Sequence, residues 1–218
     1  MLPLHLGGFA RKLESVLCLG AHCDDIEIGC GGAVLELAAR GRLEKVDWIV
    51  FTSTPVRESE ARRSAERMLR NVPKRDVIIK HFRDGFLPYT GREIKEHFEE
   101  LKARLSPQLV LTHYRGDLHQ DHRLISDLTW NTFRNSMILE YEVPKYDGDL
   151  GTPNVFMEIS EELAKEKIDI LLESFESQRT KRWFSAELFQ SLLRLRGMEC
   201  SAASGLAEAF YGRKIVLG

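Results

Sequence analysis

Short apolar runs of strand type alternate with longer helical patterns through the first half of the sequence. The strand-like runs cover residues 15–20, 46–52, 77–81 and 109–112, and the helical patterns cover residues 32–40, 56–71 and 92–105. Strands that alternate with helices build βαβ units, in which consecutive strands lie parallel. This order therefore predicts an α/β fold with a Rossmann-like, mostly parallel sheet and helices on both faces.

Beyond Asp127 the pattern changes and predicts a short C-terminal extension of strands and helices. Strand-like segments at residues 137–143 and 155–159 flank a turn-rich stretch, and helical patterns follow near residues 161–176 and 186–196. Gly197 comes directly after this last pattern and is expected to end the helix. Because no repeat, low-complexity tract or clear linker divides the sequence, residues 1–218 are expected to form a single domain.

Composition narrows the class of protein. The chain has 218 residues, 43% of them hydrophobic and 29% charged, which is enough apolar material for a buried sheet inside a solvated shell. Its formal net charge of -2 argues against a general binder of polyanions. The basic residues between Arg57 and Arg75 are interleaved with glutamates, as on a solvated helix face. We therefore expect no nucleic-acid partner.

The four cysteines show no CxxC spacing, and no secretory leader accompanies them. A disulfide framework is therefore not expected, and the cytoplasm is the expected compartment. No apolar stretch approaches the roughly 20 residues that a membrane-spanning helix needs. The sequence thus predicts a soluble protein without a membrane span.

Two short runs of polar residues each follow a strand-like segment. The first is residues 21–27, Ala-His-Cys-Asp-Asp-Ile-Glu, and the second is residues 119–122, His-Gln-Asp-His. In open α/β sheets, binding sites form at such strand ends. His22 and Asp25 are three residues apart and can face one ion together, and His122 can supply a third ligand. Three protein ligands and one open position are typical of catalytic zinc.

These runs resemble the motifs of a known family. Residues 21–27 are similar to the Ala-His-Pro-Asp-Asp-x-Glu signature of the LmbE-like (PIG-L type) zinc-dependent N-acetylglucosaminyl deacetylases, and residues 117–123 match that family's Asp-x-His-x-Asp-His. Further landmarks extend the resemblance through nearly the whole chain, namely Arg57-x-x-Glu60, Phe82-Arg83-Asp84-Gly85, Ser177-Gln178 and Ala207-Glu208-Ala209-Phe210. Two positions depart from the pattern: Cys23 replaces the usual proline, and Phe175 stands where a histidine often precedes Ser-Gln.

The resemblance implies that His22, Asp25 and His122 hold one zinc ion per chain. It also implies that Asp24 is the general base and that His119 acts on the other side of the scissile bond. Zinc would lower the pKa of a water towards about 7 and polarise the carbonyl of an amide. The expected reaction is hydrolysis of the linear amide C–N bond of an N-acetyl group.

The side chain of His119 needs a partner in this reaction. A protonated His119 could stabilise the oxyanion and then give its proton to the departing amine. Asp121 or Asp117 is expected to orient the His119 ring and to balance its charge. Asp121 is therefore counted with Asp24 and His119 as a catalytic candidate.

The expected substrate is an N-acetylated amino sugar or a glycoconjugate that contains one. By resemblance, Arg57 and Asp84 lie at the pocket rim and hold sugar hydroxyls, although a plain surface ion pair explains Arg57 nearly as well. Residues 144–153 are long and polar enough to form a mobile cover. Three aromatic residues are candidates for stacking on a pyranose, namely Trp130, Tyr141 and Tyr146.

Two other classes of function remain open at this stage. Residues 29–32, Gly-Cys-Gly-Gly, follow the first strand much as a dinucleotide fingerprint does. However, the carboxylates in the preceding turn would repel a pyrophosphate, so a helix-packing role for Gly31 and Gly32 is preferred. The chain could also be a catalytically silent sugar-binding or partner-binding module on the same scaffold. The sequence leaves open whether the chain forms a homo-oligomer.

Overall fold

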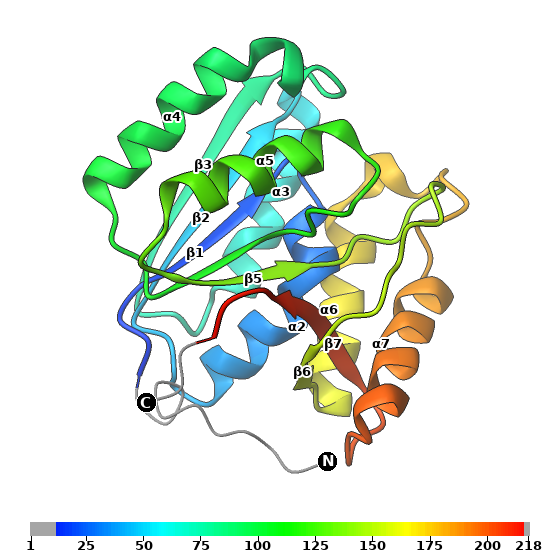
Figure 1. Ribbon diagram of the computed structural model, residues 1–218. Coiled ribbons are helices and arrows are strands. Elements are labelled where there is room, and N and C mark those ends of the chain that lie inside the picture. Colours follow the sequence, from blue (N-terminus) through cyan, green and yellow to red (C-terminus); the bar gives the residue numbers. More distant parts are fainter. Residues whose placement is uncertain (1–11, 216–218) are drawn as a thin grey trace.

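The computed structural model describes residues 12–215, and the strands of this part form a single sheet (Figure 1). Their order across the sheet is β3-β2-β1-β4-β5-β7-β6. The strands are β1 (Val16–Gly20), β2 (Lys45–Thr52), β3 (Lys74–Phe82), β4 (Leu109–His113), β5 (Met137–Tyr141), β6 (Val155–Glu158) and β7 (Ala207–Gly212). Strands β1 to β5 pair in parallel, whereas β7 is antiparallel to both β5 and β6. The prediction of a Rossmann-like, mostly parallel sheet is confirmed.

Helices cover both faces of this sheet. They are α2 (Asp25–Ala39), α3 (Pro55–Met68), α4 (Gly91–Arg104), α5 (Gln120–Thr132), α6 (Glu161–Ser174) and α7 (Ala186–Cys200), with the short 3-10 helices η1 (Leu87–Thr90) and η2 (Glu176–Gln178). Figure 1 shows α4 and α5 on one face and α2, α3 and α6 on the other, with α7 beside β7. Within residues 12–215, no helix combines the length and the apolar character needed to cross a membrane.

Side chains that alternate in direction along the central strands form a separate hydrophobic core on each face of the sheet. In β1, Cys18 belongs to the core under α2, α3 and α6, whereas Leu19 belongs to the core under α4 and α5. Strand β2 repeats this pattern with Trp48 and Phe51. Successive side chains of a strand point to opposite faces, so a strand covered on both sides is apolar at every position. Burial of each large side chain stabilises the fold by about 1.5–3 kcal/mol.

One α-helix and one strand were not predicted, α5 and β7, and α2 begins at Asp25 rather than at residue 32 as expected. The buried face of α5 carries mostly polar residues, including Asp121, His122, Ser126 and Thr129, so its sequence lacks an apolar helical period. Strand β7 reads Ala-Glu-Ala-Phe-Tyr-Gly and completes the sheet between β5 and β6. The C-terminal extension therefore belongs to the same sheet as the first half of the chain.

The expectation that Gly197 ends the last helix is wrong. Helix α7 continues to Cys200, and Ser201 ends it in the left-handed conformation, with φ of 56°. A Cβ atom at Gly197 would lie 2.2 Å from the carbonyl oxygen of Gly205. The glycine is needed because the segment that leads into β7 passes directly against the helix.

The glycines of α2 also serve packing. A Cβ atom at Gly29 would lie 2.1 Å from the ring of Tyr141, and one at Gly32 would lie 2.8 Å from Glu208 Oε1. Both oxygens of the Glu208 carboxylate accept backbone N–H groups in the middle of α2, from Gly32 at 2.8 Å and from Ala33 at 2.7 Å. A side chain of the protein itself thus occupies backbone N–H groups of the glycine-rich segment that a dinucleotide would have to bind.

The strand order places the polar motifs together. The order reverses between β1 and β4, because β2 and β3 continue on one side of β1 while β5 follows β4 on the other. In open α/β sheets a ligand crevice forms outside the carboxyl ends of the strands at such a reversal. Residues 21–25 follow β1, and residues 119–122 form the N-cap and first turn of α5, which follows β4, so both motifs meet at this crevice.

Candidate active site

The first motif occupies the turn from β1 into α2. His22 lies in the turn, Asp24 is the N-cap of α2, and Asp25 is the first residue of the helix. The backbone N–H of His22 donates to Asp25 Oδ2 at 2.6 Å, which fixes the carboxylate on the same side of the turn as the imidazole. Asp25 is buried, so its position is set by the fold rather than by solvent.

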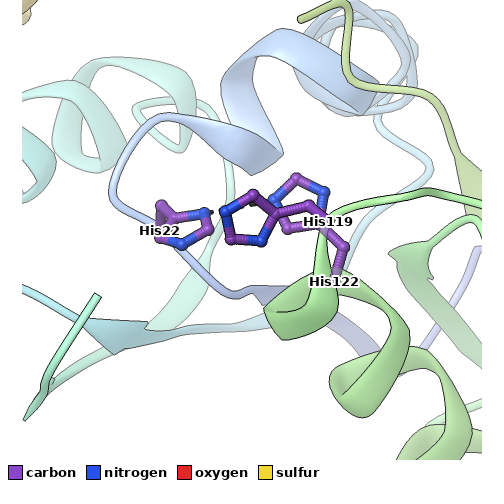
Figure 2. A group of neighbouring side chains, drawn as sticks. All are labelled: His22, His119 and His122. Atoms are coloured by element: carbon purple, nitrogen blue, oxygen red, sulfur yellow. Dashed lines mark hydrogen bonds between the residues drawn. The ribbon is translucent and has the colours of Figure 1, made fainter. Parts of the chain in front are cut away.

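The second motif caps helix α5. His119 is the N-cap, and its Nδ1 accepts from the backbone N–H of Asp121 at 3.2 Å. His122 follows in the first turn of the helix and is buried. Figure 2 shows the rings of His119 and His122 at the start of α5, with His22 approaching them from the β1–α2 turn. The ring centroids of His22 and His119 are 4.8 Å apart, and those of His22 and His122 are 5.1 Å apart.

Three ligand atoms from the two motifs form a small triangle. His22 Nδ1 lies 3.1 Å from His122 Nε2 and 3.2 Å from Asp25 Oδ2, and His122 Nε2 lies 3.5 Å from Asp25 Oδ2. Zinc binds nitrogen and oxygen at about 2.0–2.2 Å, so two ligands of a tetrahedral ion are roughly 3.3–3.6 Å apart. The triangle therefore fits three corners of a tetrahedral zinc site and leaves the fourth corner towards the cavity.

The second nitrogen of each of these imidazoles faces a carboxylate. His122 Nδ1 lies 2.8 Å from Asp117 Oδ2. His22 Nε2 lies 3.0 Å from Asp84 Oδ1 and 3.3 Å from Asp121 Oδ2. A carboxylate that accepts from one ring nitrogen keeps the proton there and leaves the other nitrogen free to bind metal. Both tautomers are therefore set for ligation by the atoms of the triangle.

The electrostatics of the cluster favour positive charge. Burial opposes a charge on His22, but the carboxylates of Asp25 and Asp121 outweigh it and raise the His22 pKa well above its usual value. Burial likewise opposes a charge on His122, yet Asp25 and Asp117 raise its pKa. Burial acts to raise the pKa of Asp25, but the neighbouring histidines lower it well below the usual range. The same carboxylates would attract a divalent cation.

Asp24 is buried beside this triangle and lines the same cavity. Its Oδ1 accepts from Arg57 Nη2 at 2.7 Å, whereas Oδ2 is buried without a hydrogen-bond partner in residues 12–215. Arg57 also approaches Glu60, with Nε 3.8 Å from Oε2. Arg57 thus lines the cavity as expected, but its guanidinium holds the carboxylate of Asp24, and one oxygen of Asp24 remains available to a proton.

The surroundings of His119 differ from the expectation. Asp121 Oδ2 accepts from the backbone N–H of Gly85 at 2.8 Å and faces His22, and Asp117 Oδ1 accepts from the backbone N–H of His119 at 2.7 Å. Within the described part of the chain, neither carboxylate forms a hydrogen bond with the His119 ring. The polypeptide turns at the N-cap so that the His119 ring bonds to its own helix, and its Nε2 is left to carry the proton. Burial, followed by the charges of His122 and His22, lowers the His119 pKa.

Asp84 reaches the triangle from the end of β3. Its side chain is 76% exposed, and its Oδ1 lies 3.0 Å from His22 Nε2. The hydrogen bond with His22 lowers the Asp84 pKa although partial burial opposes this. Gly85 follows with φ of 79°, a conformation that favours glycine, and turns the chain so that its N–H meets Asp121. Asp84 therefore lies at the rim, but it contacts a candidate metal ligand as well as the cavity.

A cavity of about 750 Å³ opens above these residues. Tyr146, which is 76% exposed, contributes to its wall, whereas the other two aromatic candidates do not. Tyr141 is fully buried and donates to Leu19 O at 2.6 Å, and Trp130 packs outside the cavity and donates to Glu140. Trp183, which the sequence did not single out, lines the cavity instead.

The segment 144–153 is attached to the protein at several points. Asp149 Oδ2 accepts from the backbone N–H of Leu118 at 2.7 Å and from Lys145 Nζ at 2.5 Å. Lys145 Nζ also lies 2.8 Å from Asp117 Oδ2, and Arg196 donates to Gly151 O at 3.2 Å. These contacts link the segment to the carboxylate that holds His122.

Sequence reasoning also missed His113, the last residue of β4. It is fully buried, its ring stacks on that of His122 with centroids 3.9 Å apart, and its Nε2 accepts from the backbone N–H of Ala21 at 2.9 Å. Burial, followed by the charge of His122, lowers the His113 pKa to about 4. His113, Asp25 and His122 also form a candidate ligand group. A polar residue at the last position of a buried strand was the signal that could have indicated it.

Cys23, which stands where the related motif has proline, directs its thiol to the end of β2. Its thiol is buried and donates to Thr52 O at 3.3 Å, which ties the turn to the end of β2. Burial raises the pKa of the Cys23 thiol to about 12. Because a thiolate is needed for metal binding or oxidation, this neutral thiol serves as a packing group in the turn.

Comparisons with known proteins relate the chain to one family. Residues 17–133 match the family model PIG-L, described as GlcNAc-PI de-N-acetylase. The uncharacterized deacetylase YaiS of Escherichia coli K12 is 26% identical over 169 residues, which cover 74% of this chain and 91% of YaiS.

Two solved structures share the fold. One is the N,N'-diacetylchitobiose deacetylase of Pyrococcus horikoshii, with 20% identity, coverage of 95% of this chain and 86% of that chain, and a TM-score of 0.70. The other is GalB, the 4-carboxy-2-hydroxymuconate hydratase of Pseudomonas putida KT2440, with 16% identity, coverage of 94% and 98%, and a TM-score of 0.74. One fold therefore carries two reactions, and the residues of the site must decide between them.

Proposed function

Because the chain belongs to the PIG-L (GlcNAc-PI de-N-acetylase) family, we propose that it is a zinc-dependent hydrolase that removes the N-acetyl group from an amino sugar or an amino-sugar conjugate. The observation that carries this proposal is the triangle of His22, Asp25 and His122, which lines one cavity together with Asp24, whose Oδ2 has no hydrogen-bond partner among the described residues. Zinc, when bound there, supplies a Lewis acid that polarises a carbonyl and lowers the pKa of a water.

The protein's own residues then have separate tasks. Oδ2 of Asp24 accepts a proton from the attacking water, while Arg57 holds Oδ1 and keeps the carboxylate oriented. His119 presents Nε2–H to the cavity, where it donates a hydrogen bond to the charge that develops on the carbonyl oxygen. The proton that Asp24 has taken from the water passes to the departing nitrogen. The C–N bond of the amide breaks, and the products are acetate and a free amine.

Asp121 and Asp117 act as positioning residues in this proposal. Asp121 faces His22 and accepts from Gly85, and Asp117 holds His122 while it accepts from the backbone of His119. Each carboxylate therefore fixes one imidazole of the triangle. We also propose that residues 1–218 form one deacetylase domain, since all described strands belong to one sheet.

The test is an acetate-release assay over N-acetylated amino sugars and their conjugates, run with zinc added and with zinc chelated. Wild-type protein should release acetate only with metal. Asp24→Asn should bind zinc as wild type does and lose turnover, because the amide cannot accept the proton. Asp76→Asn, which changes an exposed carboxylate on β3, is the matched control and should keep full activity.

Two outcomes would contradict the proposal. Parental turnover in Asp24→Asn would remove the assigned base. No acetate from any compound, with zinc shown to be bound, would favour the alternative of a sugar-binding or partner-binding module without catalysis.

A further inference from the structure

The peptide just before His22 is held by the strands on both sides of β1. β1 lies between β2 and β4, and its parallel pairing with both strands ends before Ala21. There the backbone N–H of Ala21 donates to His113 Nε2 at 2.9 Å, and Ala21 O accepts from the N–H of Thr52 at 2.9 Å and from its Oγ1 at 2.8 Å. The last residues of β4 and β2 thus bind both polar groups of a buried peptide, which need partners.

This arrangement fixes the proton of the His113 ring. A backbone N–H can only donate, so Nε2 of His113 is unprotonated and the ring proton lies on Nδ1. Nδ1 is buried without a hydrogen-bond partner in residues 12–215, so the ring gives up one hydrogen bond in order to hold Ala21. The lone pair of Nε2 is already used by Ala21. Although His113 lies close enough to Asp25 and His122 to share an ion with them, it is therefore not expected to be a ligand.

The same ring also bears on the second motif. Its plane is 18° from that of the His122 ring, with the centroids 3.9 Å apart, and both rings are buried. Asp117 fixes the rotation of His122 through Nδ1, whereas the stacked ring of His113 stops His122 from moving towards β4. In a closely packed interior such a contact sets a position, because no space is left for the ring to shift.

We propose that His113 is a positioning residue that sets the distance between the two metal-binding motifs. It holds the peptide that leads into His22 and packs against His122, whose ligand atoms lie 3.1 Å apart. His113 is not among the residues that line the cavity, so it acts through these two histidines and not on the substrate. The inference rests on the zinc site of the proposed function.

Two substitutions separate the hydrogen bond from the ring. His113→Gln can place its amide oxygen near the position of Nε2 and keep an acceptor for Ala21. His113→Phe keeps a flat ring but leaves the N–H of Ala21 buried without an acceptor. The zinc Kd of His113→Phe should rise at least about tenfold, as expected when a group that orients metal ligands is lost. That of His113→Gln should lie between wild type and His113→Phe.

Thr112→Val is the matched control, because it changes the residue before His113 on the same buried strand. It removes the hydroxyl that lies 3.0 Å from Thr129 Oγ1, which is a buried contact away from both motifs. This variant should lower the melting temperature and leave the zinc Kd as in wild type. A general loss of stability would therefore not produce the change expected for His113→Phe.

Cobalt(II) gives a second measurement, because its visible absorption depends on the arrangement of its ligands. The spectrum of cobalt-loaded His113→Phe should differ from that of wild type, and His113→Gln should restore it in part. At saturating zinc, His113→Phe should have a lower kcat with an unchanged KM. A zinc Kd and a cobalt spectrum equal to wild type in His113→Phe would overturn the proposal. Equal loss of metal in both His113 variants would also overturn it and would indicate that the imidazole is a ligand.

If His113→Phe does not fold, Thr52 provides the same test from β2. Thr52→Val removes the hydroxyl that donates to Ala21 O and should weaken zinc binding, whereas Thr52→Ser keeps the hydroxyl and should bind zinc as wild type does. Equal zinc affinity in Thr52→Val and wild type would then count against the positioning of this peptide.

The metal measurements also separate this inference from the proposed function. If wild type releases no acetate but zinc affinity falls in the expected order, the reaction is wrong and the role of His113 is supported. If wild type releases acetate and His113→Phe binds zinc equally well, the role of His113 is refuted while the deacetylase function stands.

Discussion

Replacement of Asp117 by asparagine tests how the protein prepares His122 for metal. Asp117 Oδ2 lies 2.8 Å from His122 Nδ1, and Oδ1 accepts from the backbone N–H of His119 at 2.7 Å. Although burial opposes it, the hydrogen bond with His122, followed by the one with Lys145, lowers the Asp117 pKa well below the usual range. The carboxylate therefore accepts from both neighbours, and the proton of His122 stays on Nδ1.

Asparagine has nearly the same shape but only one acceptor oxygen. If the amide oxygen stays on the backbone of His119, the NH2 group meets Nδ1 of His122, which must then accept. The ring proton moves to Nε2, the atom that belongs to the metal triangle. If the amide turns over, its NH2 group meets the N–H of His119 instead. The first orientation opposes zinc binding directly, because Nε2 must lose its proton before it can bind. The second keeps the His122 tautomer but leaves the N–H of His119 without its acceptor, which destabilises the turn that carries the site.

The magnitude follows from the partner that is lost. Replacement of the groups that orient a metal-binding histidine costs about 10- to 100-fold in metal affinity, which is roughly 1.4–2.7 kcal/mol. We therefore expect the zinc Kd of Asp117→Asn to rise 10- to 100-fold, measured by competition with a chelating indicator. Asp127→Asn, on the same helix but paired with Arg115 outside the triangle, is the control and should bind as wild type does. An unchanged Kd in Asp117→Asn would refute the argument from the tautomer.

Three further predictions concern catalysis and stability. His119→Ala should lower acetate release at least 100-fold and retain zinc, because loss of one hydrogen-bond donor to the developing oxyanion costs about 10²–10³-fold; full activity would remove His119 from the reaction. Lys167→Met should lower the free energy of unfolding by about 3–5 kcal/mol in urea titrations, since it leaves the buried carboxylate of Glu208 without its cation at 2.6 Å; a loss under about 1 kcal/mol would refute this. Burial acts to raise the Glu36 pKa, but the N–H of Ser160 and other donors outweigh it and lower the pKa. The ionised Glu36 carboxylate therefore stabilises the fold at pH values above the pKa that it has in the unfolded chain, and this stabilisation is lost as the pH falls through the lowered pKa. Glu36→Gln should therefore cost about 1 kcal/mol near pH 7 and progressively less below about pH 4, and a constant difference across this range would contradict the assignment.

Much of the fold was readable because its signals are local. Strands β1, β2 and β4 are buried on both faces and therefore appear as apolar runs, and the alternation of strands with helices predicted the parallel sheet. Helix α5 gave no such signal, because polar side chains that belong to the site occupy its buried face. Gly197 gave a misleading signal, because a glycine is needed there for close packing against the backbone of Gly205. No local sequence pattern encodes that contact.

The site, like the fold, could be predicted from the sequence only in part. The spacing of His22 and Asp25 on one turn, and the position of His122 after a second strand, indicated which residues would meet, and their ligand atoms do lie within 3.5 Å of one another. The partners of the carboxylates were not readable. Asp121 faces His22 rather than the ring of His119, because the turn at Gly85 brings β3 against the start of α5.

One carboxylate joins the two sides of the cavity. Arg57 and Glu60 are three residues apart at the start of α3, a spacing that places both side chains on one helix face. From there Arg57 holds the proposed base Asp24, while Glu60 takes the Ser177 hydroxyl and so decides which atom Gln178 presents. A change at Glu60 therefore disturbs the orientation of the proposed base and that of Gln178, on the opposite wall of the cavity, together.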